Sequence, residues 1–186
     1  MDQNRRQLYF IAILPPSPLL EEMDELKHYF ENRYQSKASL NSPPHITLHM
    51  PFEWKEEKEK KLTVALTAFC ESQRPVTINL ENFGCFEPRV IYINVIKNPA
   101  LDLLQKELHQ FFKKELNLFN ARYKDLPFHP HVTLAFRDLK KPMFYKAWEE
   151  FKEKKFTHDF LAHKISLLKH DGKMWQIHTE FLPINN

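Results

Sequence analysis

The chain has 186 residues, of which 42% are hydrophobic and 27% charged, and its formal net charge at pH 7 is +3. This length predicts one domain, and a hydrophobic fraction that includes sixteen phenylalanines excludes an intrinsically disordered protein. Because glycine occurs only at Gly84 and Gly172, the glycine-rich phosphate loops of the Walker and Rossmann types are also excluded.

The cellular compartment is suggested by the cysteines and by one apolar run near the N-terminus. Cys70 and Cys85 lack metal-ligand spacing, so we expect reduced thiols in a cytoplasmic protein. The run Leu8–Leu14 is too short to cross a membrane, and no small-residue cleavage site follows it. We therefore interpret this run as a buried strand and not as a signal peptide, and we expect no membrane partner.

The first half of the chain predicts the order strand, helix, strand, helix, strand. Apolar residues alternate or run continuously where strands are expected, and recur at three- and four-residue steps where helices are expected. Prolines begin and end the second strand, because proline cannot sit inside a central strand. The five elements cover Leu8–Leu14, Leu19–Tyr34, Pro44–Pro51, Glu56–Glu71 and Val76–Glu81.

The same order begins again after Pro88. Its elements are a strand over Val90–Ile96, a helix opened by Asn98-Pro99, a strand at Pro130, a helix opened by Lys141-Pro142 and a strand over Ile165–Leu168. Asp171-Gly172 then predicts a type I′ turn, from which a last strand returns through Trp175. We predict one α+β domain over residues 1–186, with similar repeats over about 7–83 and 90–169 and a closing hairpin over about 163–183.

One short motif occurs once in each repeat. The first copy reads Pro44-His45-Ile46-Thr47-Leu48, and the second reads Pro130-His131-Val132-Thr133-Leu134. Since residues i and i+2 of a strand point the same way, the histidine and threonine of each copy share one face. A pseudo-two-fold relation between the repeats would bring both strands to one cleft.

Two such motifs suit acid–base chemistry on a phosphodiester. With an unperturbed pKa of about 6.5, one histidine can act as a base while its partner acts as an acid at the same pH. The threonine hydroxyls can bind the non-bridging oxygens as charge builds on them. The arrangement requires no metal, no cofactor and no covalent intermediate, and the pattern leaves open which histidine is the acid.

The paired motifs, with Phe83-Gly84-Cys85-Phe86 and Val90-Ile91-Tyr92 between them, resemble the 2H phosphoesterase superfamily. The likeness is greatest to its branch of 2′-5′ RNA ligases and 2′,3′-cyclic phosphodiesterases. It implies two lobes whose antiparallel sheets face each other across a central cleft, with helices outside. The implied partner is an RNA end or a small cyclic nucleotide whose 3′-oxygen leaves, and we expect a monomer. The implied catalytic residues are His45, Thr47, His131 and Thr133.

Three further residues are candidates for substrate binding. Arg137 comes one place later than the basic residue that many members of this superfamily carry after the second motif, and strand parity would put it on the motif's face. Trp175 stands where the closing strand often has a tyrosine, and it can either stack on a base or belong to the core. His49 lies on the strand face of His45, although Pro51 suggests that the strand ends there in solvent.

Two alternatives use the same residues differently. The cleft could bind RNA ends or nucleotides with little catalysis, or His129 and His131 could form a metal site, for which the sequence shows no third ligand with recognisable spacing. The remaining histidines, among them His109, show no pattern and are expected to be exposed or helix-face residues. Turnover of a 2′,3′-cyclic mononucleotide with EDTA present separates these interpretations from the acid–base enzyme.

Overall fold

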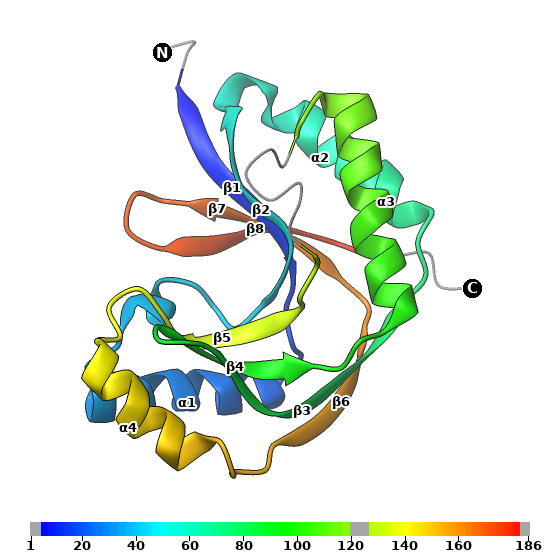
Figure 1. Cartoon of the computed structure of the whole chain (residues 1–186). Helices are drawn as coiled ribbons and strands as arrows, with labels where there is room; N and C mark the ends of the chain where they lie inside the picture. Colours follow the sequence, from blue (N-terminus) through cyan, green and yellow to red (C-terminus); the bar gives the residue numbers. More distant parts are fainter. Residues whose placement is uncertain (1–4, 120–126, 183–186) are drawn as a thin grey trace.

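The computed structural model describes residues 5–119 and 127–182. The strands are β1 (Arg6–Ile13), β2 (Ile46–Lys55), β3 (Val76–Phe86), β4 (Val90–Val95), β5 (His131–Ala135), β6 (Thr157–Ala162), β7 (Ile165–His170) and β8 (Trp175–Phe181). The helices are α1 (Leu19–Tyr34), α2 (Glu59–Glu71), α3 (Pro99–Leu116) and α4 (Lys141–Phe151), with 3-10 turns η1 (Ala38–Asn41) and η2 (Glu56–Lys58). The α+β class is thus confirmed (Figure 1). No helix among the described residues is long and apolar enough to cross a membrane.

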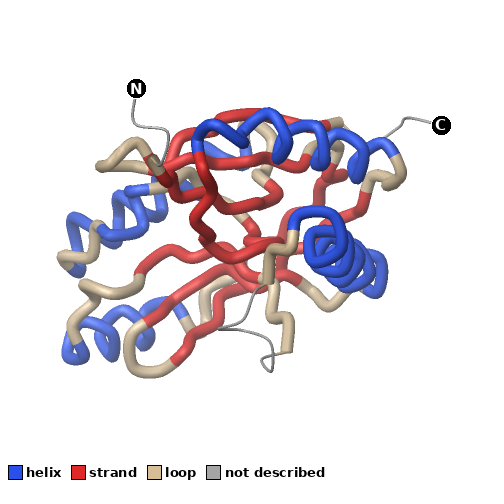
Figure 2. Tube along the Cα trace, turned by 90° about the horizontal axis from the view of Figure 1, so that it is seen from above, coloured by secondary structure: helices blue, strands red, loops and turns tan. Residues whose placement is uncertain are grey.

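All eight strands belong to one curled antiparallel sheet in the order β6-β3-β4-β5-β2-β1-β7-β8. Its two halves join where β2 meets β5, and the register pair there is Ile46 with Val132. α1 and α4 pack on the half that contains β5, whereas α2 and α3 pack on the half that contains β2 (Figures 1 and 2). The half with β5 combines strands from both predicted repeats, since β3 lies beside β4.

β1 lies inside the sheet with both of its faces covered, as its continuous apolar sequence predicts. Tyr9, Ile11 and Ile13 point into the main core beneath the helices and are at most 1% exposed. Phe10 and Ala12 point to the opposite face, where they form a small apolar cluster with Leu168. This alternation separates a packed face of the sheet from a face that borders a cavity.

β2 continues through Pro51 to Lys55, so the predicted end of this strand at the proline is wrong. In the pairing with β1, Met50 and Pro51 together stand opposite the single residue Phe10, which is a β-bulge. A bulged residue is left out of the hydrogen-bond ladder, so the N–H that proline lacks is not needed there.

Two other features differ from the predictions. The strand that follows α4 is β6, not β7 as the predicted second repeat has it, and the sequence pattern does not indicate β6 because only Phe160 and Ala162 of its six residues are buried. β7 and β8 do form the closing hairpin, but four residues separate the pair His170 and Trp175. Within this turn only Gly172 has a positive φ (+101°), so the turn is not the two-residue type I′ that was expected.

A buried lysine holds the loop that leads into β2. Lys27 of α1 is 1% exposed, and its Nζ donates hydrogen bonds to the carbonyl oxygens of Ser39 (2.9 Å) and Ser42 (2.6 Å). Asp138, which follows β5, anchors the start of the same loop by accepting a hydrogen bond from Ser36 Oγ (2.8 Å). These contacts connect the approach to the first motif with the exit from the second.

The buried ammonium of Lys27 predicts a pH-dependent stability. Burial lowers the pKa of Lys27 from 10.5 to about 8. Between these values the unfolded chain keeps a proton that the folded protein has released, so this group's contribution makes the free energy of unfolding rise with pH. Relative to Lys27→Met, the wild type should therefore gain up to about 1.4 kcal/mol per pH unit across that window.

Urea denaturation of both proteins at several pH values between about 8 and 10.5 measures this difference. Methionine keeps most of the apolar stem of lysine, so the comparison isolates the charge and its two hydrogen bonds. A difference between the two proteins that stays constant with pH contradicts a perturbed Lys27.

Candidate active site

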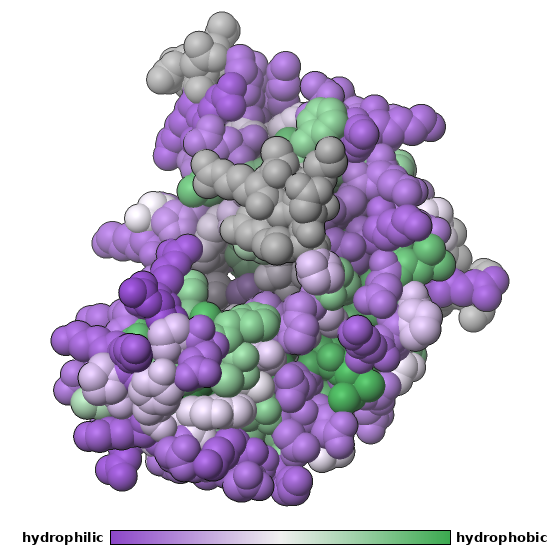
Figure 3. Space-filling view, viewed as in Figure 1, coloured by the Kyte–Doolittle hydropathy of each residue, from purple (hydrophilic) through white to green (hydrophobic). Residues whose placement is uncertain are grey.

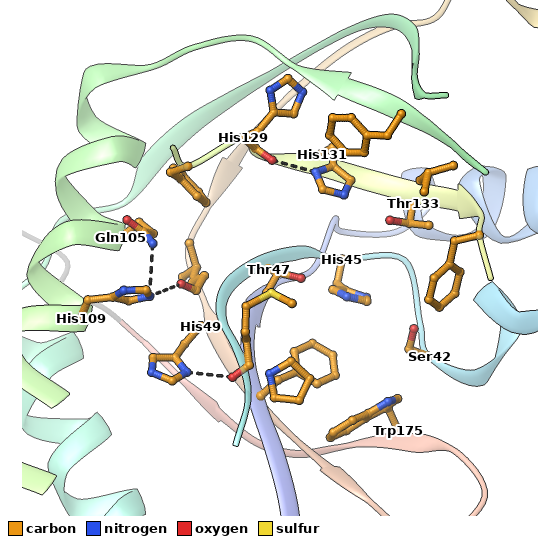
Figure 4. A pocket seen from close by; sticks show the side chains of 18 of the residues that line it. Ser42, His45, Thr47, His49, Gln105, His109, His129, His131, Thr133 and Trp175 are labelled. Carbon is orange, nitrogen blue, oxygen red and sulfur yellow. Dashed lines mark hydrogen bonds between the residues drawn. The ribbon is translucent and has the colours of Figure 1, made fainter. Parts of the chain in front are cut away.

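The open face of the sheet borders one large cavity of about 1090 Å³. Figure 3 shows that hydrophilic side chains predominate on this face of the molecule, with hydrophobic patches between them, and Figure 4 shows side chains that line the cavity. All seven site residues predicted from the sequence line this cavity: His45, Thr47, His131, Thr133, Arg137, Trp175 and His49. The structure thus brings together residues from β2, β5, β8 and the loop after β5.

The register of β2 against β5 determines how the two motifs meet. Their middle residues, Ile46 and Val132, pair with each other in antiparallel register, and both are completely buried on the core side of the sheet. The flanking residues consequently point to the cavity side, and each histidine lies diagonal to its counterpart. Continuing the same register sets His45 opposite Thr133 and Thr47 opposite His131 (Figure 4).

Both motif histidines are held by the same local hydrogen bond. Nδ1 of His45 lies 2.7 Å from the carbonyl oxygen of Pro43, and Nδ1 of His131 lies 2.7 Å from that of His129. A carbonyl oxygen only accepts, so each Nδ1 carries the hydrogen and donates it. Nε2 is therefore the nitrogen that each ring has available for a ligand, as a base when neutral and as an acid when protonated.

Aromatic rings pack against each motif histidine. The ring centroid of Phe10 lies 4.7 Å from that of His45, and Trp175 packs edge-on against Phe10, also at 4.7 Å. On the other side of the cavity, Tyr92 and Phe86 lie 4.9 Å and 5.3 Å from His131. The half-buried Trp175 lines the cavity and also packs on the apolar cluster of Phe10, Ala12 and Leu168.

Gly84 is the position where a close approach requires glycine. A Cβ added there would lie 2.5 Å from Cε2 of Tyr92 and 2.5 Å from Oδ1 of Asn94, far inside van der Waals contact. The absent side chain therefore lets Tyr92 lie against β3, where its hydroxyl is 3.2 Å from Nε2 of His129.

Burial sets the protonation of the histidines in the cavity. It lowers the pKa of His45 to about 4, and the charges of Lys27 and His131 act in the same direction. Burial also lowers the pKa of His131, and it lowers that of His49 to about 4. Without a ligand these rings are neutral at pH 7. An anion bound between His45 and His131 raises both pKa values, because an opposite charge favours the protonated form.

Arg137 lines the cavity because the chain turns after β5, and not because the alternation of strand residues continues to position 137. β5 ends at Ala135, and Arg137 has a positive φ of 54°. The turn is closed by a hydrogen bond that the backbone N–H of Asp138 donates to the carbonyl oxygen of Phe136 (2.6 Å). The guanidinium lies 4.9 Å from the ring centroid of Phe136, at the rim of the cavity.

Two histidines of the cavity, His49 and His109, lie in surroundings that the sequence did not indicate. His49 is only 2% exposed, because β2 does not end in solvent at Pro51. His109 is a half-buried residue on a face of α3, and its Nε2 donates to the carbonyl oxygen of Leu48 (2.9 Å). The four-residue steps from Gln105 to His109 and on to Lys113 mark one helix face that lines the cavity. That spacing is the signal that would have identified them.

The geometry includes no cluster of three or more histidine, cysteine, aspartate or glutamate side chains arranged to hold a metal ion within residues 5–119 and 127–182. His129 does lie beside His131, with 6.0 Å between the ring centroids, and it lines the same cavity.

The chain was compared with known proteins and structures. A sequence profile of the 2′-5′ RNA ligase superfamily matches residues 15–174. A relative from Geobacillus kaustophilus, named as a phosphoesterase, is 28% identical over 177 residues, which cover 94% of this chain and 95% of that protein. A relative of the same designation from Bacillus cytotoxicus is 26% identical over 174 residues, which cover 92% and 94%.

Solved structures share the fold. Escherichia coli LigT in complex with 3′-AMP superposes with a TM-score of 0.68 at 21% identity, covering 97% of this chain and all of that one. TT0787 of Thermus thermophilus superposes with a TM-score of 0.68 at 20% identity, covering 95% and 97%. The profile match confirms the resemblance identified from the two motifs, and the structural likeness supports the same fold.

The hydrogen bonds to Nδ1 make a prediction about the histidine protons. At pH 7 His45 and His131 should both be neutral, with the hydrogen on Nδ1, and His45 should gain its second proton only near pH 4. Two-dimensional ¹H–¹⁵N NMR of the imidazoles distinguishes the two tautomers and follows each titration. A hydrogen on Nε2, or a His45 that titrates at its unperturbed value, contradicts the described geometry.

Proposed function

The chain belongs to the 2′-5′ RNA ligase superfamily of 2H phosphoesterases, and we propose that it opens 2′,3′-cyclic phosphates on RNA ends or small nucleotides by paired-histidine acid–base catalysis. The observation that carries this proposal is the shared cavity of the two motifs. Both histidines use Nδ1 for a backbone carbonyl and have Nε2 available beside the other motif's threonine.

The proposed reaction moves two protons and exchanges one bond at phosphorus. Nε2 of the basic histidine takes a proton from water as the water oxygen attacks phosphorus. The bond from phosphorus to the 3′-oxygen breaks, and Nε2–H of the acidic histidine gives that oxygen its proton. The product carries a 2′-phosphate, and one further proton transfer restores the starting states. Each of the two roles contributes roughly 10²–10⁴ to the rate.

We infer that His45 is the base and His131 the acid. The buried ammonium of Lys27 opposes a positive charge on His45, so His45 is the ring that more readily stays neutral. Burial lowers the pKa of His131 as well, but a phosphate anion between the rings favours its protonated form.

Neighbouring groups supply binding and orientation in this proposal. The hydroxyls of Thr47 and Thr133 face the cavity and can donate to the non-bridging oxygens, where charge increases during attack. Arg137 places a permanent positive charge at the rim, which suits a phosphate. Trp175 offers an aromatic surface on which a base can stack, worth about 1–3 kcal/mol.

The two histidine roles can be separated by the leaving group. His45→Ala should abolish turnover of both a 2′,3′-cyclic nucleotide and the p-nitrophenyl ester of uridine 3′-phosphate, because both need a base. His131→Ala should lower turnover of the 2′,3′-cyclic nucleotide by roughly 10²–10⁴. It should leave turnover of the p-nitrophenyl ester unchanged, because p-nitrophenolate leaves without a proton. Initial rates with both substrates, measured with and without EDTA, test this assignment.

Exposed His28 on α1 provides the matched control, and His28→Ala should keep wild-type rates and melting temperature. Both motif variants should melt within a few degrees of the wild type, because their imidazoles face a cavity and not packed core. Wild-type turnover of the cyclic phosphate by either motif variant would refute the proposed mechanism. A wild type that binds nucleotides but turns over neither substrate would favour the binding-module alternative, and loss of activity with EDTA would favour the metal alternative.

The pH dependence of kcat/KM should be bell-shaped, with its maximum below the unperturbed histidine pKa of 6.5. The rate falls at low pH as the base gains a proton, and burial lowers the pKa of His45 to about 4. It falls at higher pH as the acid loses its proton, and burial also lowers the pKa of His131 in the free enzyme. Both limbs belong to the coupled pair. A maximum well above pH 6.5 would contradict this account.

A further inference from the structure

The cavity extends beyond the two motifs along one helix. We define this extension as the α3 arm, formed by Gln105, His109 and Lys113 of α3 with His49 of β2, and all four residues line the cavity. The helix residues lie four apart, so they share one face of α3 over about 12 Å. Figure 4 shows Gln105 and His109 on the opposite side of the motif residues from Trp175.

The part of α1 that corresponds to the α3 arm in the predicted repeat is buried and does not line the cavity. Counted back by 82 residues, the spacing that relates Leu62 to Phe144 in the predicted repeat, Gln105 and His109 correspond to Met23 and Lys27. Both α1 residues are at most 1% exposed, and Lys27 is bonded to the carbonyl oxygens of its own loop. The cavity is therefore extended on one side only, although the motifs at its centre are alike.

The amide of Gln105 has capacity left for a ligand. A glutamine side chain offers two donors and an acceptor oxygen with two lone pairs. Its one contact among the described residues is between its Nε2 and Nε2 of His109, at 3.2 Å. Nε2 of His109 carries the hydrogen that it donates to the carbonyl oxygen of Leu48 (2.9 Å), so it cannot accept one from Gln105, and this contact uses none of the amide's hydrogen-bonding capacity.

The arm is polar but carries little charge. His49 is 2% exposed, its Nδ1 donates to the carbonyl oxygen of Met50 (2.9 Å), and burial keeps the ring neutral at pH 7. Burial also lowers the pKa of His109. The one permanent charge of the arm is the exposed Lys113, which has no carboxylate partner among the described residues and lies 5.6 Å from the ring centroid of Phe119.

This pattern matches the parts of a nucleotide. Neutral amide and imidazole groups hydrogen-bond the edge of a base, and a lysine ammonium binds a phosphate. Met50, Leu118 and Phe128 supply apolar surface around these groups. The whole cavity, at about 1090 Å³, is slightly larger than the roughly 300–1,000 Å³ found for small-molecule sites. It is large for one mononucleotide alone.

We propose that the α3 arm binds the second nucleoside from the end of an RNA chain that terminates in a 2′,3′-cyclic phosphate. Gln105 is then a specificity-determining residue for that nucleoside, and Lys113 binds a phosphate of the chain. This inference rests on the proposed function for its placement of the cyclic phosphate between His45 and His131. The terminal base lies toward Trp175, and the 5′ direction of the chain runs along α3.

The test compares two substrates that differ by one nucleoside. These are adenosine 2′,3′-cyclic phosphate and the dinucleotide ApA that ends in the same cyclic phosphate. The wild type should show a kcat/KM roughly tenfold higher for the dinucleotide. Gln105→Ala and Lys113→Ala should each lower that preference several-fold and leave kcat/KM for the mononucleotide unchanged. Gln110→Ala is the matched control, because Gln110 lies on the exposed face of α3 outside this cavity.

Equal kcat/KM for both substrates in the wild type overturns the inference, and so does an equal loss on both substrates in Gln105→Ala. A preference for a cyclic phosphate of ADP-ribose over the dinucleotide overturns the assignment to RNA. Calorimetry with 3′-AMP and 3′-phosphorylated ApA separates this inference from the proposed function. If the wild type binds the dinucleotide roughly tenfold more tightly and Gln105→Ala loses this difference, the result supports the inference about the α3 arm, even if the wild type turns over neither substrate. Equal binding of the two ligands by the wild type overturns the inference.

Discussion

The site depends on one backbone pairing, that of Ile46 with Val132. It joins the two halves of the sheet, and both side chains are buried in the core, so the hydrophobic effect holds the register. Because side chains alternate along a strand, the same register turns both histidines and both threonines to the cavity. A slip of β2 by one residue would bury His45 and expose Ile46. The chemistry of the polar face is therefore fixed by the packing of the apolar face.

The two motifs supply two like groups, whereas acid–base catalysis needs two unlike ones. The immediate surroundings of the motif histidines are equal, since both donate from Nδ1 to a carbonyl oxygen two residues earlier at 2.7 Å. The groups farther from the two rings differ between the two sides of the cavity. The loop before β2 is held by the buried cation of Lys27, whereas the cavity on the other side is open along α3. The closing hairpin adds Trp175 to one side alone. In the proposed function these differences assign roles to two chemically identical side chains and give the substrate a direction.

The sequence predicted what periodicity and local chemistry determine. Both motifs, the four helices and the central strand β1 follow from apolar spacing and proline positions, and the profile match confirms the family that the motifs resemble. What it missed depends on tertiary contacts. Pro51 is tolerated because β2 forms a bulge against β1 there. β6 is a strand because its backbone pairs with β3, which is distant in the sequence. Arg137 reaches the cavity through a tight turn and not through strand parity. His109 is a helix-face residue whose importance arises only when α3 packs beside β2.

A chain with two glycines lacks the glycine-rich loops that surround a phosphate with backbone amides, and the candidate site uses side chains instead. Its candidate ligands are side chains on two neighbouring strands, whose positions are set by the sheet before any substrate arrives, so little ordering is required on binding. Such rigidity has a consequence for charge. Burial keeps both motif histidines neutral at pH 7, because it lowers the pKa of each. In the proposed reaction the anionic substrate itself restores the proton to the acid, so protonation of His131 is coupled to binding. A neutral ligand of the same shape would enter a site whose acid is uncharged, and the enzyme would then select its substrate by charge as well as by fit.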